Sequence, residues 1–247
     1  MRWLTAVLVT LLFAAALPLQ ARTSACEVPG ELTVASDAFP NAARALKAGK
    51  PVLILVLGSG SSTVGGTSAP ANLYPARLQV ELRARLPSAE ITVTVRGGRG
   101  LLASDMLAQL DEAVATLKPV ILVWQTGTVD AVRGIDPDTF LGVLAAGVAK
   151  TESAQIDLVL MDMQFSRAGR AAMNLGPYRD AMKTIAATSA NTTFFPRYDL
   201  MRYWAESGRI DVERAPRAEW AAAADQLHAC LAEVLADTIA KGIALSR

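Results

Sequence analysis

The chain has 247 residues, a formal net charge of +1 and a hydrophobic share of 52%. This composition supports a sizeable core and excludes an intrinsically disordered chain, and the absence of a long basic run argues against nucleic-acid binding. One histidine and two cysteines are too few ligands for a structural zinc site, so we expect no metal centre.

Residues 1–25 have the organisation of a secretory signal peptide. A positively charged start at Arg2 precedes an apolar run over residues 4–17, and small residues follow at Ala21 and Ala25. The apolar run is too short and too poorly flanked for a stable transmembrane helix, and no second run of spanning length follows it. We expect cleavage after one of the two alanines and export to the periplasm or the medium.

The remaining chain, residues 26–247, is expected to form a single domain. Its two cysteines, Cys26 and Cys230, lie near opposite ends, and export makes a disulfide between them chemically allowed. That bond would tie the mature N-terminus to the last predicted helix. A lipoprotein anchor on Cys26 is the alternative, although Thr23 occupies the position where such anchors usually have leucine.

Apolar runs of strand length alternate with helical patterns along the rest of the chain. Strands are predicted over residues 51–57, 91–95, 119–124, 156–161 and 192–195. Helices are predicted over residues 74–86, 104–117, 137–149, 178–187 and 219–243. This alternation is typical of right-handed β–α–β units, so we predict an α/β fold: a three-layer α/β/α sandwich around a mostly parallel five-stranded sheet.

Ligands of such folds bind at the carboxyl ends of the strands. Glycine and small polar side chains follow each of the first three predicted strands, over residues 58–66, 96–100 and 125–130. The first of these segments lacks the lysine of a phosphate-binding P-loop. Residues 98–103 formally match a dinucleotide fingerprint, but no acidic residue ends the next strand to hold a ribose. We therefore expect no cofactor.

These segments, together with Asp225 and His228 in the late sequence D-Q-L-H, resemble the four motif blocks of the SGNH/GDSL hydrolase family. The first family block reads G-D-S-L-T-x-G. Alignment of residues 63–65 with its T-x-G places Ser61 at the nucleophile position, and Ser62 is the alternative. The fourth block is intact, with the aspartate three residues before the histidine.

The second and third blocks depart from the family pattern. Residues 95–100 correspond to N-x-G-x-x-G, which implies that Gly100 donates a backbone N–H to the oxyanion hole, although Val95 replaces the asparagine. Residues 127–130 correspond to G-x-N-D, and Val129 replaces the asparagine whose amide would be a further donor. Replacement donors close in the sequence are Gln125, Thr126 and Thr128.

The resemblance implies a flavodoxin-like SGNH hydrolase fold and hydrolysis of carboxylic esters of small acyl groups, without metal or cofactor. Ser61 would attack the ester, His228 would accept its proton, and Asp225 would orient the imidazole. The substrate would be a small ester or an acylated glycan. Two other classes stay open. One is a degenerate domain that binds a glycan or acylated ligand without turnover; the other is an O-acyl transferase acting on an envelope polysaccharide, which uses the same residues with a different acceptor.

Overall fold

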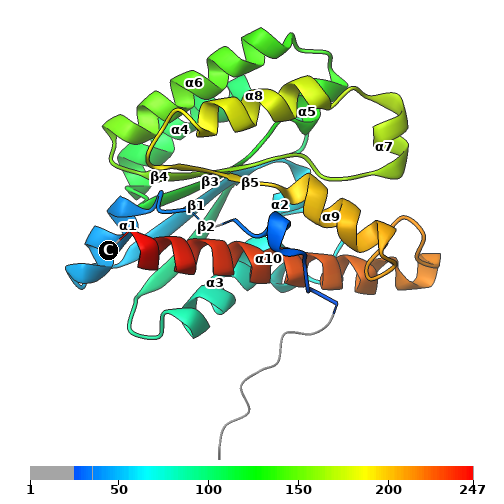
Figure 1. The fold of residues 1–247 in the computed structure, drawn as a ribbon, viewed down its shortest axis with the longest axis horizontal. Helices are drawn as coiled ribbons and strands as arrows, with labels where there is room; N and C mark the ends of the chain where they lie inside the picture. Colours follow the sequence, from blue (N-terminus) through cyan, green and yellow to red (C-terminus); the bar gives the residue numbers. More distant parts are fainter. Residues whose placement is uncertain (1–24, 35, 247) are drawn as a thin grey trace, which may run out of the picture.

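The computed structural model describes residues 25–34 and 36–246. Five parallel strands form one sheet in the order β2-β1-β3-β4-β5 (Figure 1). The strands are β1 (Val52–Gly58), β2 (Ile91–Gly97), β3 (Ile121–Gln125), β4 (Asp157–Met161) and β5 (Thr192–Phe195). The predicted α/β fold is confirmed, and this strand order is that of flavodoxin-like folds. The predicted signal peptide, apart from Ala25, lies outside the described residues.

Helices cover both faces of the sheet (Figure 1). One face packs against α1 (Pro40–Lys47), α3 (Tyr74–Arg85), α9 (Arg197–Glu206) and α10 (Trp220–Leu245). The other face packs against α4 (Ala103–Leu117), α6 (Pro137–Ser153) and α8 (Gly176–Ala186). Three short helices, α2 (Gly60–Thr63), α5 (Thr128–Val132) and α7 (Arg167–Ala172), lie in the connections.

The central strands are buried on both faces, which explains why they appear in the sequence as continuous apolar runs. Ile54 and Val56 of β1 belong to the core beneath α3 and α10, whereas Leu55 and Leu57 belong to the core beneath α4 and α6. Every residue of β3 and β4 is buried. The helices on both faces therefore fix the position of the carboxyl ends of these strands.

The strand register brings three polar or glycine-rich segments together. Gly58, the last residue of β1, pairs with Gly97 of β2 on one side and with Gln125 of β3 on the other. Gly97 has a φ of +114°, and a Cβ at this position would lie 2.0 Å from the carbonyl oxygen of Gly58. Only glycine permits this approach, and β2 consequently continues two residues beyond its predicted end at residue 95.

A disulfide joins Cys26 to Cys230 of α10, with 4.9 Å between the two Cα atoms. The sulfur of Cys26 is consumed by this bond, so it cannot at the same time carry a thioether-linked lipid. The lipoprotein alternative is therefore incompatible with the structure of this segment.

Within the described residues, no helix combines the length and the apolar character that a membrane crossing requires.

Candidate active site

A cleft of about 420 Å³ opens at the carboxyl ends of β1, β2 and β3. It is lined by Ser59, Gly60, Ser61, Val64, Gly65, Gly66, Arg99, Gly100, Thr128, Val129 and Gln164. Two predicted site residues, Ser61 and Gly100, thus lie in one cleft although they follow different strands. This is where the topology of a parallel sheet places a ligand site.

The serine turn after β1 holds its two candidate nucleophiles in different environments. Ser61 is partly exposed and lines the cleft, whereas Ser62 is fully buried. The Ser62 hydroxyl lies 2.9 Å from the hydroxyl of Tyr74 and also donates to the side-chain oxygen of Gln125. Of the two serines, only Ser61 is open to a substrate in the cleft.

Gln125 is a buried amide that organises the serine turn. Its Nε2 donates to the hydroxyls of Ser59 at 2.8 Å and Ser61 at 3.0 Å, while its Oε1 accepts from Ser62. Both donors of this amide are therefore engaged, so Gln125 is not a free oxyanion donor. The sequence indicated a polar residue at the end of the third strand, but the role of Gln125 depends on its pairing opposite Gly58.

His228 of α10 is only 3% exposed and is held by two backbone groups. Its Nδ1 accepts the backbone N–H of Tyr74 at 2.9 Å, and the imidazole also hydrogen-bonds to the backbone of Gly65. Burial, followed by the positive charge of Arg197, lowers the pKa of His228 to about 4. The imidazole is accordingly neutral at pH 7, with Nδ1 unprotonated. Within the described residues, its ring nitrogens make no hydrogen bond with Ser61 or Asp225.

The glycine aligned with the family T-x-G sequence lies directly against this imidazole. A Cβ at Gly65 would be 2.6 Å from both Nε2 and Cε1 of His228, so the first and fourth predicted blocks are in contact. The structure thus places the serine turn and the histidine side by side, with the backbone of Gly65 bonded to the imidazole. Gly65 is needed here for space, since its φ is not positive.

Asp225 is turned towards the loop before α3. Its carboxylate accepts from the backbone N–H of Ser68 at 2.9 Å, from the Ser68 hydroxyl, and from Nδ2 of Asn72 at 2.9 Å. The spacing of three residues puts Asp225 and His228 on the same side of α10, but each binds a different part of residues 65–74. In this conformation Asp225 does not orient the imidazole.

Arg197 and Tyr74 are site residues that the sequence analysis missed. Arg197 is 1% exposed, and its Nε and Nη1 have no hydrogen-bond partner among the described residues. Burial lowers its pKa, but a guanidinium titrates so far above neutrality that it remains charged. In the sequence, the segments that begin at Tyr74 and at Arg197 resemble segments of one branch of the family, but packing of helix or core explained each of them equally well.

Thr128 is part of the cleft wall and has a hydroxyl without a hydrogen-bond partner among the described residues. Its Oγ1 is buried and has no hydrogen-bond partner among the described residues, and the residue lines the cleft beside Val129. Thr126 also has a buried, unpartnered hydroxyl, but it does not line the cleft. Of the three replacement donors suggested by the sequence, Thr128 alone is a cleft-lining residue whose hydroxyl has no partner among the described residues.

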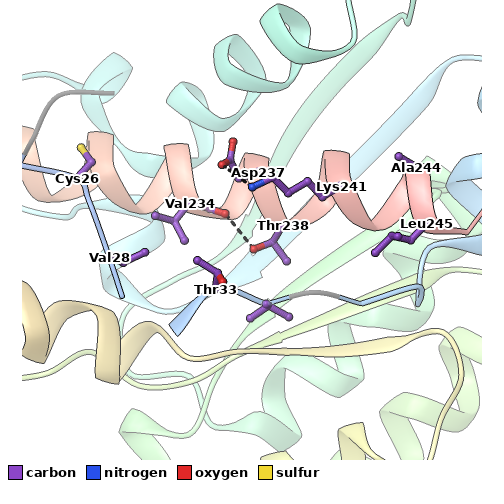
Figure 2. A pocket seen from close by; sticks show the side chains of 10 residues that line it. Cys26, Val28, Thr33, Val234, Asp237, Thr238, Lys241, Ala244 and Leu245 are labelled. Atoms are coloured by element: carbon purple, nitrogen blue, oxygen red, sulfur yellow. Dashed lines mark hydrogen bonds and ion pairs between the residues drawn. The ribbon is translucent and has the colours of Figure 1, made fainter. Parts of the chain in front are cut away.

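A second hollow of about 490 Å³ lies between the N-terminal segment and α10 (Figure 2). Its wall is mostly apolar, with Asp237 paired to Lys241 at 3.3 Å along the helix. It is lined by Cys26, Val28, Thr33, Val34, Val234, Asp237, Thr238, Lys241, Ala244 and Leu245. None of the predicted site residues is among them.

The parallel sheet, its strand order and the serine turn at the end of β1 have the arrangement expected of the SGNH/GDSL-type fold. The chain belongs to the Non-GDSL lipase-like family, whose model matches residues 25–245. The resemblance predicted from the sequence is confirmed. Comparison with curated protein sequences finds no match.

Solved structures share the fold at low sequence identity. An acetylxylan esterase from Geobacillus stearothermophilus is 20% identical, with a TM-score of 0.58 over 75% of this chain and 93% of that chain. LAE5, an alpha/beta hydrolase enzyme from the metagenome of Lake Arreo, Spain, is 20% identical, with a TM-score of 0.57 over 79% and 96% of the two chains. TesA is also 20% identical, with a TM-score of 0.57 over 74% and 97%.

Replacing His228 with asparagine is expected to change how stability depends on pH. Folded His228 has a pKa of about 4 against an ordinary value of 6.5, so between these values the unfolded chain binds a proton that the folded chain excludes. The contribution of His228 is complete above pH 6.5 and is lost as the pH falls towards 4, by up to about 3 kcal/mol. Asparagine can accept the Tyr74 N–H but does not titrate.

The measurement is urea unfolding of both proteins from pH 7 to pH 4. The difference in unfolding free energy, wild type minus variant, should fall as the pH falls. Buried carboxyls with raised pKa values, Asp157 and Asp162, titrate in both proteins and cancel in this difference. A difference that does not vary with pH would contradict the lowered pKa.

Proposed function

We propose that this protein is a serine-dependent hydrolase of carboxylic ester bonds with small acyl groups, and that Ser61 is its nucleophile. The observation that carries this proposal is the position of the Ser61 hydroxyl. This hydroxyl lies in an open cleft at the end of β1 and accepts a hydrogen bond from the buried amide of Gln125. The neighbouring Ser62 is fully buried and does not line the cleft. Membership of a lipase-like family supports the same chemistry.

The reaction follows the two-step course of serine esterases. The Ser61 oxygen attacks the carbonyl carbon, and its proton passes to Nε2 of His228, which then protonates the leaving alcohol. Water then attacks the acyl-enzyme and passes a proton to His228. His228 protonates the departing Ser61 oxygen, and the carboxylic acid is released. In this scheme Gly100 contributes a backbone N–H to the oxyanion, and Asp225 holds the proton-bearing Nδ1 of His228.

The base role requires a change in residues 65–74. This one segment supplies both backbone partners of His228, Gly65 and Tyr74, and it also supplies the donors that engage Asp225. A shift of the segment would therefore release the imidazole towards Ser61 and the carboxylate towards Nδ1 together. Apo hydrogen-bond geometry of catalytic groups often tightens only when substrate is bound.

The same bonds favour a second function, binding of an acylated ligand without turnover. If residues 65–74 keep their partners when a ligand enters the cleft, His228 has no free nitrogen for the Ser61 proton. The two functions differ in one measurable property, which is whether the serine becomes covalently modified.

The proposal is tested by reaction with diethyl p-nitrophenyl phosphate. The Ser61 oxygen would form a bond to phosphorus, p-nitrophenolate would leave with the bonding electron pair, and the serine proton would pass to the base. We expect one label per chain, assigned to Ser61 by fragmentation of the peptide, together with hydrolysis of p-nitrophenyl acetate by untreated protein. Absence of both label and hydrolysis would overturn the hydrolase proposal and leave binding without turnover.

Thr128 is proposed as the donor that replaces the missing asparagine amide. Replacement by valine keeps the shape of the side chain and removes the unpartnered hydroxyl, so kcat is expected to fall by about 10²–10³, as for loss of one oxyanion donor. Thr126→Val is the matched control, since it removes a buried, unpartnered hydroxyl outside the cleft. Equal kcat values in the two variants would contradict the role of Thr128.

We also propose that the protein acts outside the cytoplasm. The Cys26–Cys230 disulfide supports this location, because such bonds persist in oxidising compartments.

A further inference from the structure

The cleft carries positive charge without a balancing acid. Among the residues that line it, Arg99 is the charged residue, and neither aspartate nor glutamate is present. The rest of the lining consists of glycines, uncharged polar side chains and two valines. A substrate in this cleft therefore meets a cation that no lining residue neutralises.

Two arginines lie against the glycines that shape the serine turn and the opposite wall. A Cβ at Gly60 would lie 3.0 Å from Cγ of Arg99, and a Cβ at Gly100 would lie 3.6 Å from Nη2 of Arg133. Gly60 immediately precedes Ser61, and Gly100 is the predicted oxyanion glycine. One arginine thus lies against the glycine that precedes the proposed nucleophile, and the other lies against the predicted oxyanion glycine.

Both guanidinium groups are available to a ligand. Arg99 and Arg133 are exposed, and neither forms an ion pair or side-chain hydrogen bond within the described part of the chain. The carboxylates in the first turns of α4 and α5 are engaged elsewhere. Asp105 accepts the backbone N–H of Leu102 at 2.9 Å, and Asp130 accepts the backbone N–H of Ala103 at 3.1 Å.

We propose that Arg99 and Arg133 select esters that carry an anionic group, a carboxylate or a phosphate, within a few bonds of the scissile carbonyl. This inference rests on the proposed ester hydrolysis at Ser61 and names its substrate class. A guanidinium presents planar paired donors that match both anions, and two of them without competing acids favour an anion over a neutral group of the same shape.

The test compares two p-nitrophenyl esters that differ in one terminal group. The hemisuccinate ends in a carboxylate where the butyrate ends in a methyl group, and their leaving groups are identical. We expect wild type to prefer the hemisuccinate in kcat/KM. Arg99→Gln and Arg133→Gln should each lower the ratio of the two kcat/KM values by about tenfold, the size expected for one hydrogen bond to a charged group.

Arg96→Gln is the matched control. Arg96 is an exposed arginine near the end of β2 that neither lines the cleft, as Arg99 does, nor lies against Gly100, as Arg133 does, and its loss should leave the ratio unchanged. Raising the salt concentration should lower the ratio for wild type and much less for the double variant Arg99→Gln/Arg133→Gln. A wild-type ratio near one, or variants that slow both esters equally, would overturn the selection of anions; the second result would make the arginines stabilisers of the oxyanion.

A binding measurement separates this inference from the hydrolase proposal. Glutarate and inorganic phosphate, titrated separately, should raise the melting temperature of wild type more than that of the double variant, and the stronger of the two identifies the preferred anion. If neither ester is hydrolysed but this difference is found, the hydrolase proposal fails while the anion site stands. If esters are hydrolysed but both anions affect the two proteins equally, the anion site is wrong.

Discussion

Replacement of Ser61 by alanine is expected to lower kcat/KM for p-nitrophenyl acetate by at least about 10³-fold. The reason is access. Ser61 presents its hydroxyl to the cleft, and Ser62, the adjacent alternative, is fully buried with its oxygen bonded to Tyr74 and Gln125. Removal of the Ser61 hydroxyl takes one acceptor from Nε2 of Gln125, at a cost of about 1 kcal/mol in unfolding free energy. A cost of this size leaves the protein folded, so the loss of activity would be one of chemistry.

Ser62→Ala is the control variant that distinguishes Ser61 from Ser62 as the nucleophile. It leaves the nucleophile in place but removes hydrogen bonds from the buried Tyr74 hydroxyl and the Gln125 oxygen, at a cost of about 1–3 kcal/mol in unfolding free energy. We expect a less stable protein with most of its activity. The reverse pattern, activity lost in Ser62→Ala and kept in Ser61→Ala, would mean that the family alignment of the serine turn is displaced by one residue.

The fold was predictable because its strands are buried on both faces. Residues 51–57 and 156–161 are continuous apolar runs, and β1 and β4 lie within one residue of those bounds. The fifth strand was predicted at its observed bounds, Thr192–Phe195. The short helices α1 and α9 were not predicted, since helices of this length have few turns over which periodicity can be recognised.

The convergence of the site was also predictable, because parallel strands end at the same edge of the sheet. Its hydrogen bonds were not. The spacing of Asp225 and His228 predicts that both lie on the same side of one helix. It cannot show that Asp225 binds Ser68 while His228 binds Tyr74. The role of Gln125 likewise follows from the pairing of β1 with β3, which is a property of the register and not of any local motif.

Loss of the Cys26–Cys230 disulfide is expected to produce the largest change in stability. The bond joins residues separated by 204 positions, so it removes a large share of the conformational freedom of the unfolded chain. Chain-entropy scaling gives up to about 5 kcal/mol of unfolding free energy for a loop of this length. For a protein of this size, that corresponds to a fall of roughly 10–20 °C in melting temperature.

The double variant Cys26→Ala/Cys230→Ala tests this by urea and thermal unfolding. Reductant should lower the stability of wild type towards that of the variant and leave the variant itself unchanged, which separates the covalent bond from any general effect of the reductant. Cys230 lies two residues after His228 on α10, so the bond also ties the N-terminal segment to the helix that carries both Asp225 and His228. If the variant is as stable as wild type, the unfolded chain gains no freedom on losing the bond, and the entropic account is wrong.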